Sequence, residues 1–165
     1  MSKKLENITF TDKSIEYFQK MDEYLLGTDL MLMLLSISPI KGKARMQKQI
    51  FLAWKTLFNN QTTDLGFFPY KFGPYSKTIT DSTNILQSTG LIKIIPRNAE
   101  ATTFSITPKG KRIINKKLKD MNINLKKLKE KKTDWDELKI RGLMKFVYRK
   151  YPEYTTKTMV PSLKW

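Results

Sequence analysis

The stretch GLIKIIPRNAEATTFSITPKG, residues 90–110, decides the expected fold. Residues 91–95 are apolar except for Lys93 and are rich in isoleucine. After a turn that begins with Pro96, residues 102–106 place Phe104 and Ile106 on one face. This pattern predicts two strands joined as a hairpin. Thr107 followed by Pro108 is typical of a helix N-cap with proline at the first helical position. The stretch therefore predicts a hairpin that leads directly into a helix.

Helices are predicted on both sides of this hairpin. Residues 75–89 carry apolar side chains at helical spacing, and Gly90 suits a left-handed C-terminal cap. After the hairpin, a helix is predicted to run from Pro108 to about Leu118. Upstream, residues 30–38 are apolar nearly all round and predict a buried helix, whereas residues 43–59 carry a single apolar stripe. Between these two helices we expect a turn, residues 39–42.

Three further segments complete the expected organisation. Residues 12–26 predict a helix that Gly27 ends, and residues 67–75, dense in aromatics but broken by two prolines and a glycine, predict an ordered loop. Residues 125–132 predict a short basic helix, and a longer helix is expected from residue 133 to Pro152. The longer helix carries an apolar stripe of Trp135, Leu138, Gly142 and Phe146.

The order helix, turn, helix, aromatic loop, helix, hairpin, helix is that of a winged helix-turn-helix. We expect a mainly α protein with a small β-hairpin, in which three helices bury one another's apolar faces and the hairpin covers the open edge. Residues 1–28 would form an N-terminal acidic helix, residues 29–119 the winged helix-turn-helix, and residues 120–165 a basic helical extension packed on it.

The composition argues against most kinds of catalysis. The 165 residues include no cysteine and no histidine, which removes thiolate metal sites, disulfides and the usual catalytic triads. The acidic run at Asp134 is better explained as helix capping than as a cation site. We therefore expect no enzyme activity, no catalytic or metal-binding residues and no cofactor.

The net charge of +16 points to a partner with many phosphates. Its distribution is uneven: residues 1–40 carry a net −2, whereas residues 109–150 carry a net +11. A general use of lysine for solubility is the alternative explanation. The longest apolar run is well short of the roughly 20 residues that span a bilayer, and no signal-peptide core follows Met1. We expect a cytoplasmic protein of a prokaryotic or viral cell, with no membrane partner.

Several motifs resemble a known family. Residues 40–52, IKGKARMQKQIFL, resemble the kGrtrLQKlvFL signature of the YwgA-like winged-helix proteins of prokaryotes, with Met46 and Gln49 where leucines are usual. Residues 68–76, FPYKFGPYS, with a later GLI, are similar to a second signature of that family. FSITPKG at residues 104–110 and YRKYPEY at residues 148–154 resemble two more.

The resemblance implies a winged-helix fold and leaves the activity open, because most YwgA-like proteins have no assigned function. The chain is also more distantly similar to Panacea and SocA-like domains, which act as antitoxins or proteolytic adaptors. That likeness implies an alternative to DNA binding, in which the same scaffold binds a protein partner through the aromatic segment and the helix that follows Pro74.

The helix at residues 75–89 stands where a recognition helix would. Asn84 suits adenine, Thr80 suits a thymine methyl group, and Ser76 and Lys77 suit phosphate. The alternative is an ordinary solvated face, which Asp81 favours because a carboxylate is repelled by DNA.

Other cations are candidates for phosphate contacts on double-stranded DNA. They lie on the turn and helix after Pro39, on the hairpin, and at the start of the helix after Thr107: Lys41, Lys43, Arg45, Lys48, Lys93, Arg97, Lys109, Lys111 and Arg112. The stretch from Lys109 to Lys132 holds 11 basic and 2 acidic residues, which suits backbone tracking.

Two further expectations concern the aromatic segment and self-association. Phe67, Phe68, Tyr70, Phe72 and Tyr75 are expected to pack as core, with a stacking surface for unpaired bases as the alternative. A homodimer is a further hypothesis, formed through the acidic first helix and the helix that carries Trp135 and Phe146. Taken together, the residues favour a DNA-binding protein of transcription-regulator type.

Overall fold

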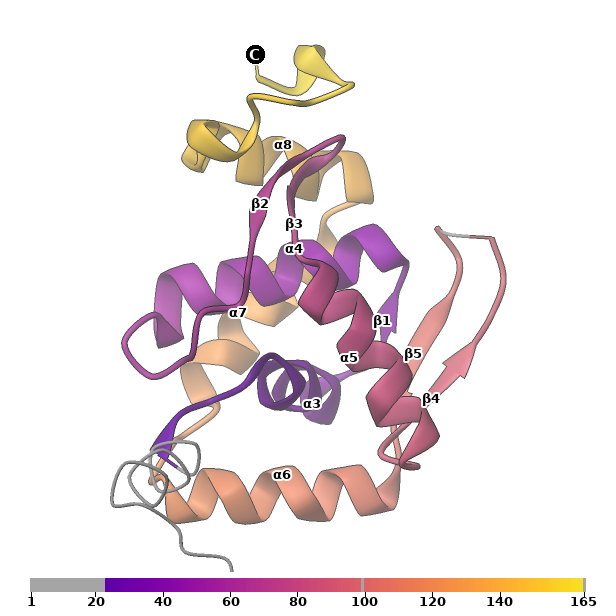
Figure 1. Cartoon of the computed structure of the whole chain (residues 1–165), viewed down its shortest axis with the longest axis vertical. Coiled ribbons are helices and arrows are strands. Elements are labelled where there is room, and N and C mark those ends of the chain that lie inside the picture. Colours follow the sequence, from indigo (N-terminus) through magenta and orange to yellow (C-terminus); the bar gives the residue numbers. More distant parts are fainter. Residues whose placement is uncertain (1–22, 99, 165) are drawn as a thin grey trace, which may run out of the picture.

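The computed structural model describes residues 23–98 and 100–164, which are mainly helical with a small antiparallel sheet (Figure 1). Two helices, α3 (Gly27–Ile37) and α4 (Lys43–Ala53), form the centre. Residues 30–35 are at most 2% exposed, as expected of a helix that is apolar nearly all round. α4 continues as the π-helix η1 (Trp54–Phe58), so the helix predicted over residues 43–59 is confirmed.

The N-terminal boundary of α3 differs from the prediction. Gly27 is the first residue of α3 instead of the end of an earlier helix, and the Asp29 carboxylate accepts a hydrogen bond from the Leu26 amide at 2.8 Å. The Asp29 side chain, in the first turn of α3, thus caps the N-terminus of its own helix. The helix predicted over residues 12–26 lies almost entirely outside the described residues.

The predicted hairpin is present as the strands β4 (Ile92–Ile95) and β5 (Thr103–Ile106). A third strand, β1 (Ile40–Lys41), pairs with the other edge of β5, where only a turn was predicted. Phe104 therefore lies opposite Ile40 on one side and Ile94 on the other. The Gly42 amide extends the β1 pairing by donating to the Thr102 carbonyl at 2.7 Å. Two residues are too few for a strand signal in the sequence.

The aromatic segment is also more regular than predicted. It forms a second hairpin, β2 (Phe68–Tyr70) and β3 (Gly73–Tyr75), in which Pro69 lies opposite Pro74. A free two-stranded ribbon tolerates proline because its outer edges need no amide donor. The prediction of an ordered loop without strands was therefore wrong, because it treated the two prolines and the glycine as breaks in secondary structure.

Both helices next to the β4–β5 hairpin are confirmed. In α5 (Lys77–Ser88), the Ser76 side chain accepts a hydrogen bond from the Ile79 amide, and Gly90 follows with a φ of 74°. In α6 (Pro108–Asp120), the Thr107 hydroxyl accepts from the Gly110 amide at 3.1 Å. These caps are local side-chain chemistry, which a sequence displays directly.

The C-terminal helices have different boundaries from those predicted. α7 (Lys126–Glu137) includes Thr133, where a new helix was expected, and α8 begins only at Ile140 and ends at Lys150. Arg45 donates to the Trp135 carbonyl at 2.8 Å and to the Leu138 carbonyl at 2.6 Å, so a residue distant in sequence satisfies the end of α7. The predicted apolar stripe is split: Trp135 is buried, whereas Phe146 is 40% exposed.

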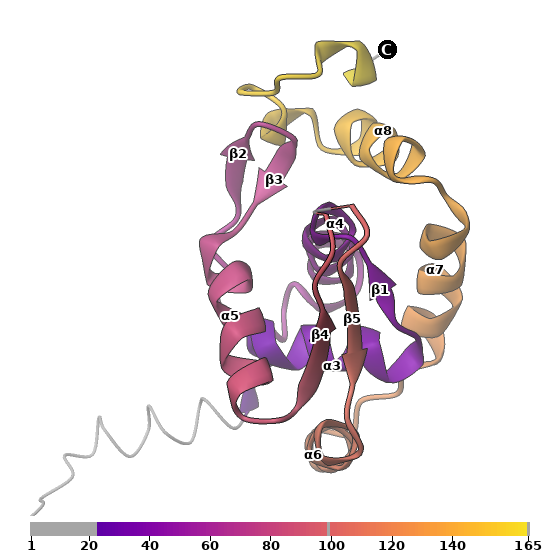
Figure 2. The same cartoon turned by 90° about the vertical axis from the view of Figure 1, so that its right-hand side faces the viewer.

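Aromatic side chains join the end of the chain to the centre. Phe51 of α4 makes edge-to-face contacts with Phe67, Tyr151 and Tyr154, at centroid distances of 5.2, 5.0 and 4.8 Å. Tyr151 precedes the short 3₁₀ helix η2 (Pro152–Tyr154), and Tyr154 is its last residue. A second 3₁₀ helix, η3 (Pro161–Lys164), lies against α8. Figure 2 shows α5 and α7 on opposite sides of the central helices, with α6 across one end.

Candidate nucleic-acid interface

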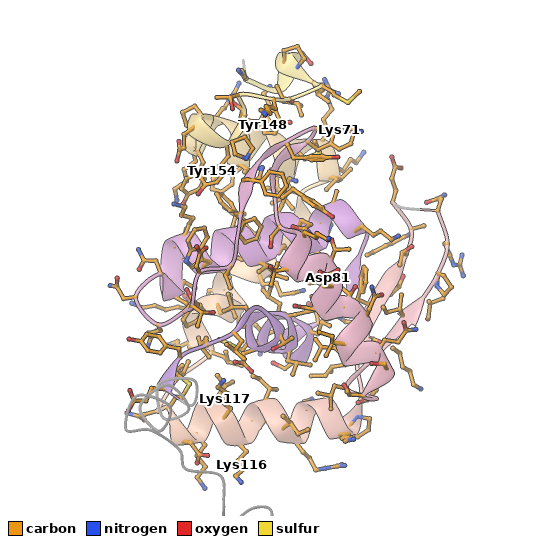
Figure 3. The ribbon with its side chains drawn as sticks, in the orientation of Figure 1. Lys71, Asp81, Lys116, Lys117, Tyr148 and Tyr154 are labelled. Carbon is orange, nitrogen blue, oxygen red and sulfur yellow. The ribbon has the colours of Figure 1, made fainter. Side chains whose placement is uncertain are left out.

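The outer face of α5 is mostly polar and almost uncharged, and Ile85 is its one large exposed apolar side chain, 55% exposed. Lys77, Thr80, Asp81 and Asn84 are exposed there, and the charges of Lys77 and Asp81 have opposite signs (Figure 3 labels Asp81). The inward side chains are the three that the apolar spacing predicted: Ile79, Ser82 and Leu86. Short neutral polar groups on an exposed helix suit hydrogen bonding to base edges or to a polar protein surface.

Ser76 does not belong to this exposed face. Its side chain is fully buried, donates to the Leu65 carbonyl at 2.5 Å and accepts from the Ile79 amide at 3.2 Å. Gln47 accepts a hydrogen bond from the Ser76 amide at 2.9 Å. The predicted phosphate contact at Ser76 is therefore wrong, because capping uses its hydroxyl inside the fold.

A groove of about 850 Å³ lies beside α5. Its walls come from α5, α4, the two hairpins and the turn that follows β4. Lys43, Lys48, Lys71 and Arg97 line it, and no acidic residue does. Thr80 and Asn84 line the same groove, so the polar face of α5 forms part of its wall.

The β2–β3 hairpin places aromatic rings at one end of the groove. Tyr70 lies 5.2 Å from Tyr75 and 5.7 Å from Phe68, measured between ring centroids, and Lys71 lies 5.6 Å from the Tyr70 ring. Phe68 and Phe72 are 43% and 49% exposed. The expectation that all five aromatics pack as core is therefore wrong for these two, whereas Phe67 packs against the core.

Lys48 is buried, contrary to its predicted role in binding phosphate. The side chain is 2% exposed, and its ammonium donates to the Pro74 carbonyl at 3.1 Å. Burial lowers the pKa of Lys48 from 10.5 to about 8, because a low-dielectric environment disfavours the charged form. An ammonium in this position has two donors left for other partners.

The cations of the Lys41–Arg45 turn have separate surroundings. Lys41 and Lys43 are exposed, whereas Arg45 is partly buried and bonded to the carbonyls at the end of α7. Arg45 thus stabilises a helix end, and its predicted phosphate contact is wrong.

Exposed cations flank α5 on the other predicted elements. Lys93 and Arg97 lie on β4 and the turn after it, and Lys111 and Arg112 lie on α6; all four are exposed. Lys109 donates to the Thr89 carbonyl at 3.2 Å, which fixes the start of α6 beside the end of α5. The structure therefore brings the predicted cations of α6 next to the predicted recognition helix.

A second hollow of about 900 Å³ lies between the β1 turn, α8 and η3, and its lining mixes charges of both signs. Below it, buried Lys132 pairs with Asp136 at 2.7 Å and bonds to Ser38. Burial lowers the pKa of Lys132, and the pair with Asp136 opposes that shift. Lys132 and Asp136 thus join α7 to the end of α3.

Sequence reasoning missed Lys71 as a groove residue. The available signal was its position, since it is the one cation within the aromatic stretch 67–75. Lys48 was among the predicted contacts, but its burial was not predicted, because α4 is buried at every position from Met46 to Ala53 and this burial has no periodicity to detect.

Within residues 23–98 and 100–164, no three acidic side chains gather as a metal site would require. No helix in this part of the chain is long and apolar enough to cross a membrane. Comparisons with protein-family models, with curated proteins and with solved structures find no match to the chain.

Proposed function

We propose that this chain is a non-catalytic, double-stranded DNA-binding protein of transcription-regulator type. The observation that carries the proposal is the exposed polar face of α5, flanked by the cations of the β4 turn and of α6. Sequence-reading proteins combine these two kinds of group, because neutral amides and hydroxyls discriminate bases while cations hold the backbone.

The element order supports the same proposal. The series α3, β1, α4, α5, β4 and β5 follows the order of a winged helix-turn-helix, with α5 as recognition helix and β4–β5 as wing. Asn84 would read a base edge in the major groove, and Lys77, Lys93 and Arg97 would contact phosphates. α6 would follow the backbone beyond the end of α5.

The proposal is tested by charge reversal on α6. The triple variant Lys109→Glu, Lys111→Glu, Arg112→Glu should weaken binding of a labelled duplex at least about tenfold at low salt, because each lost phosphate contact forgoes counterion release. Fluorescence anisotropy measures the affinity. The matched control reverses three exposed lysines of α7, Lys126, Lys127 and Lys129, on the opposite side from α5 (Figure 2).

Equal losses in the two triple variants would show that total charge, and not the α5 face, governs binding. Base reading needs a separate measurement. Lys77→Ala with Asn84→Ala should reduce the preference for the best duplex from a random-sequence selection, since one bidentate contact discriminates by about 1–3 kcal/mol. Unchanged affinity and selectivity would exclude α5 as the reading helix.

A further inference from the structure

The groove beside α5 has the charge and the surface of a site for an anion with planar groups. Lys43, Lys48, Lys71 and Arg97 line it without an acidic residue among the lining. Surfaces that hold cations without neighbouring acids attract anionic partners. The lining therefore favours an anionic occupant.

The rings at the end of the groove add planar surface. Phe72 is 49% exposed at the turn of the β2–β3 hairpin, and Tyr70 and Tyr75 line the groove below it. Lys71 belongs to the same turn, and Figure 3 shows it at the tip of the hairpin. A ring left open to water beside cations is the combination on which unpaired bases stack.

An amide with unused hydrogen-bonding capacity lines the opposite wall. Among the described residues, the side-chain amide of Gln87 has no hydrogen-bond partner, and it lines the groove. An amide presents a donor and an acceptor side by side, which matches the edge of a base. The groove thus offers all three kinds of contact that a nucleotide needs.

From this arrangement we propose that the groove binds unpaired nucleotides of a single strand. Bases stack on Tyr70 and Phe72, and Lys71 contacts phosphate. This inference rests on the proposed function, which makes nucleic acid the partner. It adds that a single-stranded segment binds beside the duplex.

The test uses the full chain and a fluorescein-labelled thymidine hexanucleotide, followed by anisotropy. Tyr70→Leu with Phe72→Leu should weaken binding at least about tenfold, because the variant removes two stacking rings and keeps apolar volume. Lys71→Gln should weaken it about threefold or more by removing one phosphate contact. Circular dichroism and thermal unfolding confirm that each variant is folded.

The chain supplies matched controls. Phe146 on α8 is 40% exposed, with Lys150 5.6 Å from its ring, the same distance that separates Lys71 from Tyr70. Phe146→Leu and Lys150→Gln should leave hexanucleotide binding unchanged. Equal losses in these controls, or wild-type affinity in the Tyr70–Phe72 double variant, would overturn the proposal.

Two further probes distinguish a single strand from a small ligand in the groove, and distinguish this proposal from that of duplex binding. Thymidine monophosphate should bind far more weakly than the hexanucleotide; equal affinity would overturn the single-strand assignment in favour of a small ligand. A blunt duplex should bind the Tyr70–Phe72 double variant as it binds the wild type. Loss of duplex binding in the α6 variant with retained hexanucleotide binding shows that the two sites are distinct.

Discussion

At the scale of single residues, Lys48 contributes an unusual pH dependence to stability. Below pH 8 its ammonium is charged in both the folded and the unfolded chain, so the cost of burying it is complete. Between about pH 8 and 10.5 the unfolded chain retains a proton that the folded chain has lost. Raising the pH through this window therefore stabilises the folded state.

Substitution isolates this effect. Lys48→Met removes the titrating group at similar volume, so the free energy of unfolding of the wild type should rise relative to the variant by up to about 3 kcal/mol between pH 7.5 and 10.5. Urea unfolding at several pH values measures the difference. A constant difference across the range would show that the Lys48 ammonium is solvated in the folded protein.

Gly73 is a second residue at which the backbone conformation restricts which side chain the position can hold. Its φ is +89°, and a Cβ there would lie 2.7 Å from Cε1 of Tyr148, which Figure 3 shows between α8 and the β2–β3 hairpin. Gly73→Ala should lower the free energy of unfolding by about 3 kcal/mol, from backbone strain and from overpacking together.

Gly90 provides the comparison, because its φ is +74° and nothing lies within 4 Å of the added Cβ. Gly90→Ala should cost only about 1 kcal/mol, from the backbone alone. Urea unfolding compares the two variants. Equal costs would mean that the Tyr148 ring moves aside freely.

At the scale of elements, two adjacent lysines of α6 lie on different faces of the helix. Lys117 pairs with Asp29 of α3 at 2.5 Å and is partly buried, whereas Lys116 is exposed and points away from the core (Figure 3). Lys117→Gln should lower the free energy of unfolding by about 1 kcal/mol. Lys116→Gln should leave it within about 0.5 kcal/mol.

Thermal or urea unfolding of the two variants checks this prediction. Both substitutions remove one positive charge from the same helix, so a general charge effect cancels between them. Identical stabilities would show that the pair between Lys117 and Asp29 is solvated and contributes nothing.

α5 carries one charge that opposes its proposed role. Asp81 is exposed in the middle of the face that would meet DNA. Asp81→Asn should strengthen duplex binding about fivefold at low salt, since it removes one repulsion of about 1 kcal/mol. Anisotropy with the duplex used above measures it, and weaker binding would place Asp81 in a favourable contact.

The elements also show what the sequence could and could not predict. The β4–β5 hairpin, the glycine that follows α5 and the N-cap of α6 were predicted correctly, because residues such as Thr107 and Pro108 act on their own neighbours. β1 and the end of α7 were missed, since β1 exists through pairing with β5 and α7 ends where Arg45 binds its carbonyls. Contacts between residues distant in sequence leave no local pattern.

The same distinction applies to the candidate interface. Exposed cations such as Lys93 and Arg97 were identified from residue type alone, because a charged side chain on a turn is normally solvated. Ser76, Lys48 and Arg45 were misassigned, since each uses its polar atoms inside the fold. Residue type predicts chemistry, but the packing of α4 decides which side chains reach solvent.

At the scale of the whole molecule, the charge predicts a steep response to salt. Only two ion pairs occur within the described residues, whereas the full chain carries a net +16. If about six phosphates are neutralised, a plot of log affinity against log salt should have a slope near −5. Anisotropy with a duplex between about 50 and 200 mM salt measures this slope, and a flat plot would exclude backbone contacts.

β5 is the central strand of its sheet, because β1 and the Gly42 amide hold the edge of β5 that β4 leaves open. A hairpin without a third strand would sample many orientations and lose that freedom on meeting a partner. Here folding itself has already fixed the orientation of Lys93 and Arg97 relative to α5. Any partner therefore meets a preorganised edge, and its selectivity reflects shape as much as charge.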